Sequence, residues 1–317
     1  MDTFPGYLSY LCFAQIVPLK NYKARSYSVP WRTSGLLRQT TPISSRFKRH
    51  SEQKVALDHP QQPHSSILRH SGFKQTPHAA IMAVEVIPLT EADIPGAIEV
   101  IQRAFADDPY FKWVFDSSKF NKQRNFDSLA ARCHWGIKNA LFHVAKETQD
   151  AHSKSHSAPL TPIPILGVSC WLAPHPPTQP ESWYSWFQSW TLSFSQVLNN
   201  IWYFGRGGLR TNRYWIWKQR QAEAQAAIWD DPRGYYFCNI VAVSPEMQGK
   251  GVGRLLFEAV LRRADDEGVK CYLESSKSVP NVAIYERMGF HMSKEMECRD
   301  GVDACMLYCM VRDPRKA

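Results

Sequence analysis

The sequence YYFCNIVAVSPEMQGKGVG, residues 235–253, decides the fold of this chain. Its first half is rich in aromatic and β-branched residues and predicts a half-buried β-strand. Ser244 and Pro245 end that strand, because proline has no N–H to donate to a sheet. A glycine-rich turn and a helical pattern follow. The helix is expected to bury one face, made of Val252, Leu255, Leu256, Ala259 and Val260.

The turn, Gln248-Gly249-Lys250-Gly251-Val252-Gly253, has the chemistry of an anion site. A helix start leaves about four N–H groups without partners, and its dipole is positive there. Glycines let the backbone approach a ligand closely, and phosphate suits such a site. Lys250 and Arg254 add positive charge. Leu256 stands where the dinucleotide fingerprint needs glycine, and the P-loop Lys-Ser/Thr pair is absent. An ordinary strand-to-helix turn is the alternative.

A second motif lies about 30 residues further along, in residues 281–290. Pro280 suits a helix start and Gly289 a helix end. Asn281 and Tyr285 are four residues apart, so they face the same side of that helix. Packing of Tyr285 against the sheet is the alternative to a chemical role.

The patterns Gln-x-x-Gly-x-Gly and Asn-x-x-x-Tyr-x-x-x-Gly-Phe together resemble the GNAT N-acetyltransferase superfamily, over about residues 83–314. The resemblance implies an α+β fold, a central mixed sheet flanked by helices. It implies acetyl-CoA as co-substrate, and Tyr285 as the acid that protonates the departing CoA thiolate. It also implies a backbone N–H of the first strand that stabilises the oxyanion. The residues implied to bind acetyl-CoA are Val241, Ala242, Val243, Gln248, Gly249, Lys250, Gly251, Val252, Gly253, Arg254 and Asn281.

The implied reaction is direct attack of a neutral primary amine on the thioester in a ternary complex. An aliphatic amine has a pKa near 10, so a base must take its proton. Many members of the superfamily carry Glu or His on the acetyl-CoA strand, whereas residues 237–240 here are Phe-Cys-Asn-Ile. Asn239 is no base, though it can hold a water, and Glu274 at the end of the next strand is the candidate. This departure keeps open a second hypothesis, a GNAT-fold module that binds CoA without turnover.

The positive charge of the chain is concentrated in its first quarter. Residues 1–80 carry +8 of the formal +9, so the remainder is nearly neutral and a nucleic-acid surface on the core has no support. A nucleic-acid role of the basic leader is the weaker third hypothesis. The leader, residues 1–81, is expected to be disordered, with a mitochondrial presequence as the alternative.

Cysteine spacing and hydropathy bear on metal binding, on the cellular compartment and on whether a helix spans a membrane. The eight cysteines form no Cys-x-x-Cys pair, so no metal site is expected and a reducing compartment is favoured. The cytoplasm is the first expectation and the mitochondrion the alternative. No run of about 18 apolar residues exists, so no membrane-spanning helix is expected.

The domain is expected to span residues 82–317, with residues 173–233 as a helical insertion before the acetyl-CoA strand, a fungal-type feature. The insertion carries an aromatic stripe at helical spacing: Trp183, Trp186, Trp190, Phe194, Val197 and Ile201. The stripe is expected to pack on the domain, with a lid over the acceptor site as the alternative. A membrane-surface helix is a weaker third option, because the polar face lacks lysines. The resemblance also implies that Tyr110, Phe111, Trp113 and Phe115 shape the acceptor site, with core packing as the alternative. A small-molecule or peptide amine is the expected acceptor. Its identity and the oligomeric state stay open.

Overall fold

In a computed structural model of the chain, the structure describes residues 83–148, 163–176, 179 and 182–315. The expected leader, residues 1–81, lies outside this part of the chain. Seven strands form one mixed sheet in the order β1-β2-β3-β4-β5-β7-β6. The strands are β1 (Val84–Pro88), β2 (Leu141–Glu147), β3 (Ile165–Leu172), β4 (Tyr236–Val243), β5 (Cys271–Ser275), β6 (His291–Asp300) and β7 (Asp303–Arg312). The helices are α1 (Ile94–Ala104), α2 (Pro109–Val114), α3 (Lys122–Asn139), α4 (Trp183–Trp202), α5 (Thr211–Ile228), α6 (Val252–Glu267) and α7 (Asn281–Arg287).

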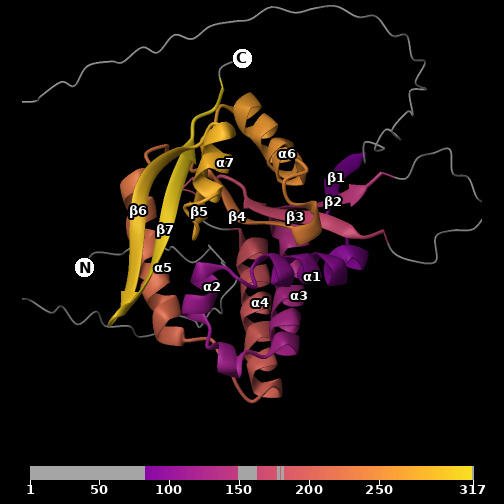
Figure 1. Cartoon of the computed structure of the whole chain (residues 1–317), viewed down its shortest axis with the longest axis vertical. Helices are drawn as coiled ribbons and strands as arrows, with labels where there is room; N and C mark the ends of the chain where they lie inside the picture. Colours follow the sequence, from indigo (N-terminus) through magenta and orange to yellow (C-terminus); the bar gives the residue numbers. More distant parts are fainter. Residues whose placement is uncertain (1–82, 149–162, 177–178, 180–181, 316–317) are drawn as a thin grey trace, which may run out of the picture. The chain divides into compact units, whose positions relative to one another are not determined.

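Helices cover both faces of the sheet (Figure 1), in agreement with the expected α+β class. Because successive strand residues point to opposite faces, neighbours in one strand serve different layers. Val144 packs with α1 and α3, whereas Ala145 packs with α6. Helices α2 and α5 pack with the β5–β7 end of the sheet through Tyr272 and Leu307.

Strands β4 and β5 run parallel, and they pair over a short stretch only. Their register runs only from Tyr236 opposite Cys271 to Cys238 opposite Leu273. On its other side β4 pairs with β3, and the register shifts so that Asn239 is an extra residue. Such a bulge bends a strand and increases its twist. Beyond Cys238 the two parallel strands therefore separate.

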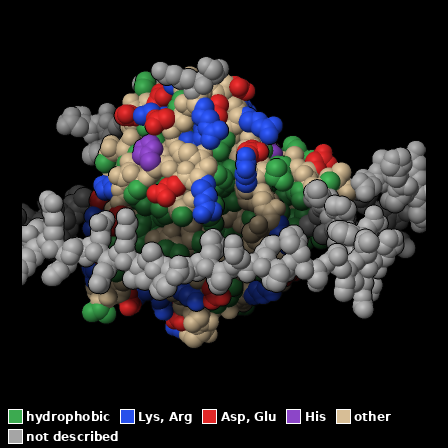
Figure 2. All heavy atoms as spheres, turned by 45° about the horizontal axis from the view of Figure 1, so that its top comes forward, with side chains coloured by type: hydrophobic (Ala, Val, Ile, Leu, Met, Phe, Trp, Pro, Cys, Tyr) green, Lys and Arg blue, Asp and Glu red, His purple; other side chains and the backbone are tan. Residues whose placement is uncertain are grey.

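The strand, turn and helix predicted from residues 235–253 are confirmed as β4, the glycine turn and α6. The predicted buried face of α6 is wrong at two positions, since Leu255 and Ala259 are exposed. The sheet lies instead against Val252, Leu256, Phe257, Val260, Leu261 and Ala264. The outer side of α6 is charged, and Arg254 pairs there with Glu258 and Arg263 with Glu267. Figure 2 shows basic and acidic side chains interspersed in the same way over the face in view.

The expected helical insertion is present as two helices, α4 and α5, but the expected inward packing of the aromatic stripe is wrong. Trp183 is 84% exposed and Phe194 63% exposed. Helix α4 turns a polar row towards α3 instead. There the Ser128 hydroxyl donates to Gln196 Oε1 at 2.6 Å, and Gln196 Nε2 donates to the Ser128 carbonyl at 3.1 Å. Because α3 presents buried polar groups on this side, the facing helix must supply hydrogen-bond partners, and its aromatic side is left facing outward.

This orientation of α4 predicts a large loss of stability for one substitution and almost no change for a neighbouring one. Leu192 is 3% exposed, so Leu192→Ala is expected to lower the free energy of unfolding by about 2–4 kcal/mol. Trp190 is 47% exposed, and Trp190→Ala is expected to change it by no more than about 0.5 kcal/mol. Urea denaturation of both variants measures the difference. A larger loss for Trp190→Ala would show that the stripe is buried after all.

The described residues contain neither a candidate membrane-spanning helix nor a candidate metal-binding cluster. No helix in this part of the chain is both long and apolar enough to cross a bilayer. No cluster of three or more potential metal ligands occurs among the same residues, and their seven cysteines are free and buried.

Candidate functional site

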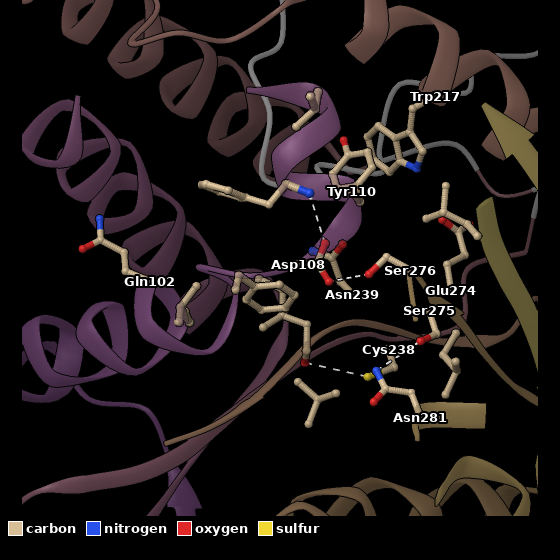
Figure 3. Close-up of a pocket in the computed structure, with 18 of the residues that line it drawn as sticks. Gln102, Asp108, Tyr110, Trp217, Cys238, Asn239, Glu274, Ser275, Ser276 and Asn281 are labelled. Carbon is tan, nitrogen blue, oxygen red and sulfur yellow. Dashed lines mark hydrogen bonds between the residues drawn. The ribbon is translucent and has the colours of Figure 1, made fainter. Parts of the chain in front are cut away.

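A cavity of about 190 Å³ opens where β4 and β5 separate, and α1, α2, α5 and α7 complete its walls (Figure 3). The residues used below that line it are Asp108, Tyr110, Phe111, Phe115, Trp217, Phe237, Cys238, Asn239, Val241, Glu274, Ser275, Ser276, Asn281, Tyr285 and Leu307. The cavity thus gathers side chains from segments that are up to about 200 residues apart in the sequence.

Helix α7 places Asn281 and Tyr285 on the cavity wall together, as their spacing of four predicts. The Tyr285 ring also packs 5.5 Å from the ring centroid of Phe257 and 6.3 Å from that of Phe290. Tyr285 therefore both packs against neighbouring rings and lines the cavity. Burial raises the pKa of the Tyr285 phenol above its usual value, and nearby Cys238 and Asp108 add to the shift. The phenol consequently keeps its proton at neutral pH. Asn281 Nδ2 donates to the Ser275 hydroxyl at 3.3 Å.

Strand β4 contributes Cys238, Asn239 and Val241 to the wall, beside and beyond the bulge. Of the other two strand residues named from the resemblance, Ala242 is 3% exposed and packs with the α1 layer. Val243 is half-buried and leads to the glycine turn. Beyond Cys238 the register with β5 has ended, so within the described residues the β5-facing edge of β4 lacks a strand partner. Such an edge can pair with an extended ligand.

The glycine turn lies outside the cavity lining, directly after β4. Gly249 and Gly251 have φ of +76° and +84°, which a residue with a Cβ adopts only with strain. Gly251 is the N-cap of α6, and no side chain among the described residues caps this helix end. Gln248 Nε2 donates to the Val243 carbonyl at 3.3 Å and so ties the turn to the strand.

The two cations of the turn are placed differently. Lys250 is exposed, with Nζ 3.8 Å from the Met247 sulfur. Arg254 is exposed as well, but its Nε donates to Glu258 at 2.6 Å, so part of its charge is already compensated. The N–H groups of Val252, Gly253 and Arg254 belong to the first turn of α6, where a helix leaves its donors without intrahelical partners. The amides, more than the cations, thus fit an anion here.

Glu274 lies on β5 and lines the cavity, and its carboxylate accepts two hydrogen bonds. Gln221 Nε2 donates to its Oε2 at 2.9 Å and the Tyr272 hydroxyl to its Oε1 at 2.8 Å. Lys218 Nζ in turn donates to Gln221 Oε1 at 2.9 Å, which fixes the orientation of that amide. Burial raises the pKa of the Glu274 carboxyl, while the hydrogen bonds from Gln221 and Tyr272 oppose that rise. Gln221 was not anticipated from the sequence, because nothing local connects α5 with β5.

A second carboxylate, Asp108, was also not anticipated as a site residue. It is 6% exposed and is the N-cap of α2, where its Oδ1 accepts from the Phe111 N–H at 3.1 Å. Its Oδ2 accepts from the Ser276 hydroxyl in the loop after β5. The signal in the sequence is the pair Asp108-Pro109, a helix start, which indicates a cap but not a cavity.

Aromatic side chains from α2, its C-cap Phe115 and α5 form a further part of the wall. Tyr110, Phe111 and Phe115 line the cavity as the resemblance implies, whereas Trp113 is 6% exposed and belongs to the core. Trp217 from α5 faces Tyr110 with 5.2 Å between ring centroids. The insertion therefore does reach the site, but through α5 and not through the aromatic stripe of α4.

Part of the chain matches a known protein family. Residues 217–307 match the family model of the acetyltransferase (GNAT) domain. An uncharacterized N-acetyltransferase of Schizosaccharomyces pombe is 25% identical over 209 residues, which is 65% of this chain and 81% of that protein. A second one from the same organism is 29% identical over 152 residues, 47% of this chain and 57% of that protein. Over residues 217–307 the chain is thus similar to the GNAT acetyltransferase domain, and two N-acetyltransferases of S. pombe resemble it over longer stretches.

Two solved structures are similar to this chain at low sequence identity. One titled as histone acetyltransferase HPA2 and related acetyltransferase, from Corynebacterium glutamicum, is 20% identical with a TM-score of 0.44, over 74% of this chain and 99% of that one. A putative acetyltransferase from Salmonella typhimurium, solved with its cofactor acetyl-CoA, is 14% identical with a TM-score of 0.39, over 74% of this chain and 96% of that one.

Proposed function

We propose that this protein is an N-acetyltransferase that moves an acetyl group from acetyl-CoA to a primary amine by direct attack. One observation carries the proposal: Tyr285, Asn281 and the open edge of β4 meet in a single cavity that also contains a carboxylate, Glu274. The match of residues 217–307 to the acetyltransferase (GNAT) domain supports the chemistry, and the S. pombe relatives are named as N-acetyltransferases.

Three parts of the protein suit successive parts of acetyl-CoA: the start of α6, the open edge of β4 and the cavity. The amides of Val252, Gly253 and Arg254 at the start of α6 suit its diphosphate, because donors and dipole there face an anion. The open edge of β4 from Val241 to Val243 suits the extended pantetheine arm, and Asn281 offers an amide beside it. The sulfur and acetyl end would then lie in the cavity near Tyr285.

In the reaction, the amine nitrogen forms a bond with the acetyl carbonyl carbon and the carbon–sulfur bond breaks. A backbone N–H of β4 near the bulge stabilises the oxyanion. Tyr285, whose phenol keeps its proton because burial raises its pKa, is the proposed donor of a proton to the departing thiolate. Glu274, ionised and with a raised pKa, accepts the proton that the ammonium must lose, directly or through a water.

A second function is a module that binds CoA without turnover. Both Glu274 oxygens already accept hydrogen bonds from the protein, and β4 carries no carboxylate of its own. Calorimetric titration with acetyl-CoA, followed by an assay of CoA release over a panel of amines, separates the two. Binding with turnover supports the enzyme, and binding without turnover for every amine supports the module.

The pH profile tests the role of Glu274. A base must be ionised, so kcat/KM is expected to fall as pH decreases through the raised pKa of this carboxyl. The hydrogen bond from Gln221 stabilises the carboxylate, so Gln221→Leu is expected to raise that pKa further and move the acid limb to higher pH. Glu274→Gln is expected to abolish the limb.

The matched control for this test is Gln219→Leu. Gln219 lies on the same helix, is exposed and bonds only Glu223 among the printed contacts of its side chain. Its replacement is expected to leave the profile unchanged. An acid limb that stays in place in both Gln221→Leu and Glu274→Gln would remove Glu274 from the mechanism.

A further inference from the structure

The charge of the cavity is one-sided. Of the described residues that line it, Asp108 and Glu274 are acidic, and none is Lys, Arg or His. A substrate carboxylate or phosphate would lose its water there without gaining a cationic partner, which is costly. An ammonium group, in contrast, is attracted by both carboxylates.

Apolar and aromatic side chains line the part of the cavity formed by α2, α5 and β7. Trp217 is 3% exposed and lies 5.2 Å from Tyr110 between ring centroids, and the Phe111 and Phe115 rings are 4.5 Å apart. Leu307 from β7 lines the same cavity. Rings at such spacing favour an apolar or aromatic body and can also contact a cation through their faces.

Both carboxylates of the cavity already accept hydrogen bonds from the protein. Glu274 is held by Gln221 and Tyr272, and Asp108 by Phe111 N–H and Ser276. A peptide main chain in this wall would leave its own polar groups unpaired, which is unfavourable. The cavity volume of about 190 Å³ also favours a small molecule.

We infer that the amine acceptor is a small monoamine with an apolar or aromatic body and no acidic group, seated between α2 and α5 with its nitrogen turned towards the carboxylates of the cavity. This substrate class rests on the proposed acetyl transfer. It excludes free amino acids by charge, and it disfavours polyamines and peptide amines by the apolar wall.

The test uses the full chain, saturating acetyl-CoA and release of the CoA thiol. The probes are 2-phenylethylamine, phenylalanine, spermidine and a lysine-containing peptide. Phenylalanine is 2-phenylethylamine with a carboxylate added next to the amine, so this pair isolates charge. We expect kcat/KM for 2-phenylethylamine to exceed that for each of the others by at least about tenfold, a factor that corresponds to about 1.4 kcal/mol.

A pair of variants then tests the wall. Trp217→Ala is expected to lower kcat/KM for 2-phenylethylamine by at least about tenfold, since an apolar contact of this size discriminates by roughly that factor. Trp215→Ala is the matched control, because Trp215 lies on the same helix, is 39% exposed and does not line the cavity. The comparison of probes on the unmodified protein does not depend on the folding of either variant.

Each outcome decides a different question. Equal or better use of phenylalanine, spermidine or the peptide would overturn the substrate class while leaving acetyl transfer in place. Failure of every amine with acetyl-CoA still bound would overturn the substrate class and favour the module without turnover. Absence of acetyl-CoA binding in the calorimeter would overturn the proposed function itself.

Discussion

Tyr285→Phe is expected to lower kcat by about 10²–10³-fold while acetyl-CoA affinity stays within about twofold. The substitution removes only the hydroxyl, so the ring contacts with Phe257 and Phe290 persist. Because burial raises the pKa of this phenol, the proton is present throughout the physiological range and can be donated to the leaving thiolate. The measurement is steady-state turnover of acetyl-CoA together with calorimetric affinity.

Tyr308→Phe is the control for this prediction. Tyr308 lies on β7, is half-buried and does not line the cavity, so its loss is expected to leave kcat unchanged. Thermal unfolding of both variants checks that neither has lost its fold. An unchanged kcat in Tyr285→Phe would remove the phenol as the general acid, and Tyr285 would then be a packing residue alone.

Gly251→Glu is expected to weaken acetyl-CoA binding by at least about 100-fold, about 2.7 kcal/mol. The carboxylate would stand at the N-cap of α6, where the diphosphate is proposed to meet the helix amides, so bulk and like charge act together. Titration calorimetry on the purified variant measures the loss.

Backbone strain must be separated from this effect, because Gly251 has φ of +84°. Gly251→Ala carries the same strain of about 1–2 kcal/mol without the charge. A Cβ at this position meets no other atom within 4 Å, so Ala introduces no clash. We expect Gly251→Ala to lose much less affinity than Gly251→Glu. Affinity retained in Gly251→Glu would contradict the placement of the diphosphate at this turn.

The parts of the fold that follow from local chemistry were predictable from the sequence. The strand before Ser244, the turn with Gly249 and Gly251, and the Asn281/Tyr285 helix face each depend on residues within a few positions of one another. The structure contains all three, and it shows that Asn281 and Tyr285 line one cavity.

The parts that depend on distant partners were not predictable. The orientation of α4 is set by the polar row of α3, including Ser128, which the periodicity of α4 does not reveal. The contact of Gln221 with Glu274 joins residues 53 positions apart. Asp108 reads in the sequence as a helix cap, and only the folding of α2 against the loop after β5 brings it to the cavity.

Binding of the coenzyme A diphosphate at the start of α6 underlies both the proposed site and the proposed reaction. Titration of the full chain with acetyl-CoA and, separately, with acetyl-pantetheine, which lacks the diphosphate, tests this binding most directly. We expect saturable one-site binding of acetyl-CoA, with an affinity in the range of about 1 μM to 1 mM where enzyme KM values lie. Acetyl-pantetheine is expected to bind at least about 100-fold more weakly, about 2.7 kcal/mol. Equal affinity for the two, or no saturable binding of acetyl-CoA, would contradict it.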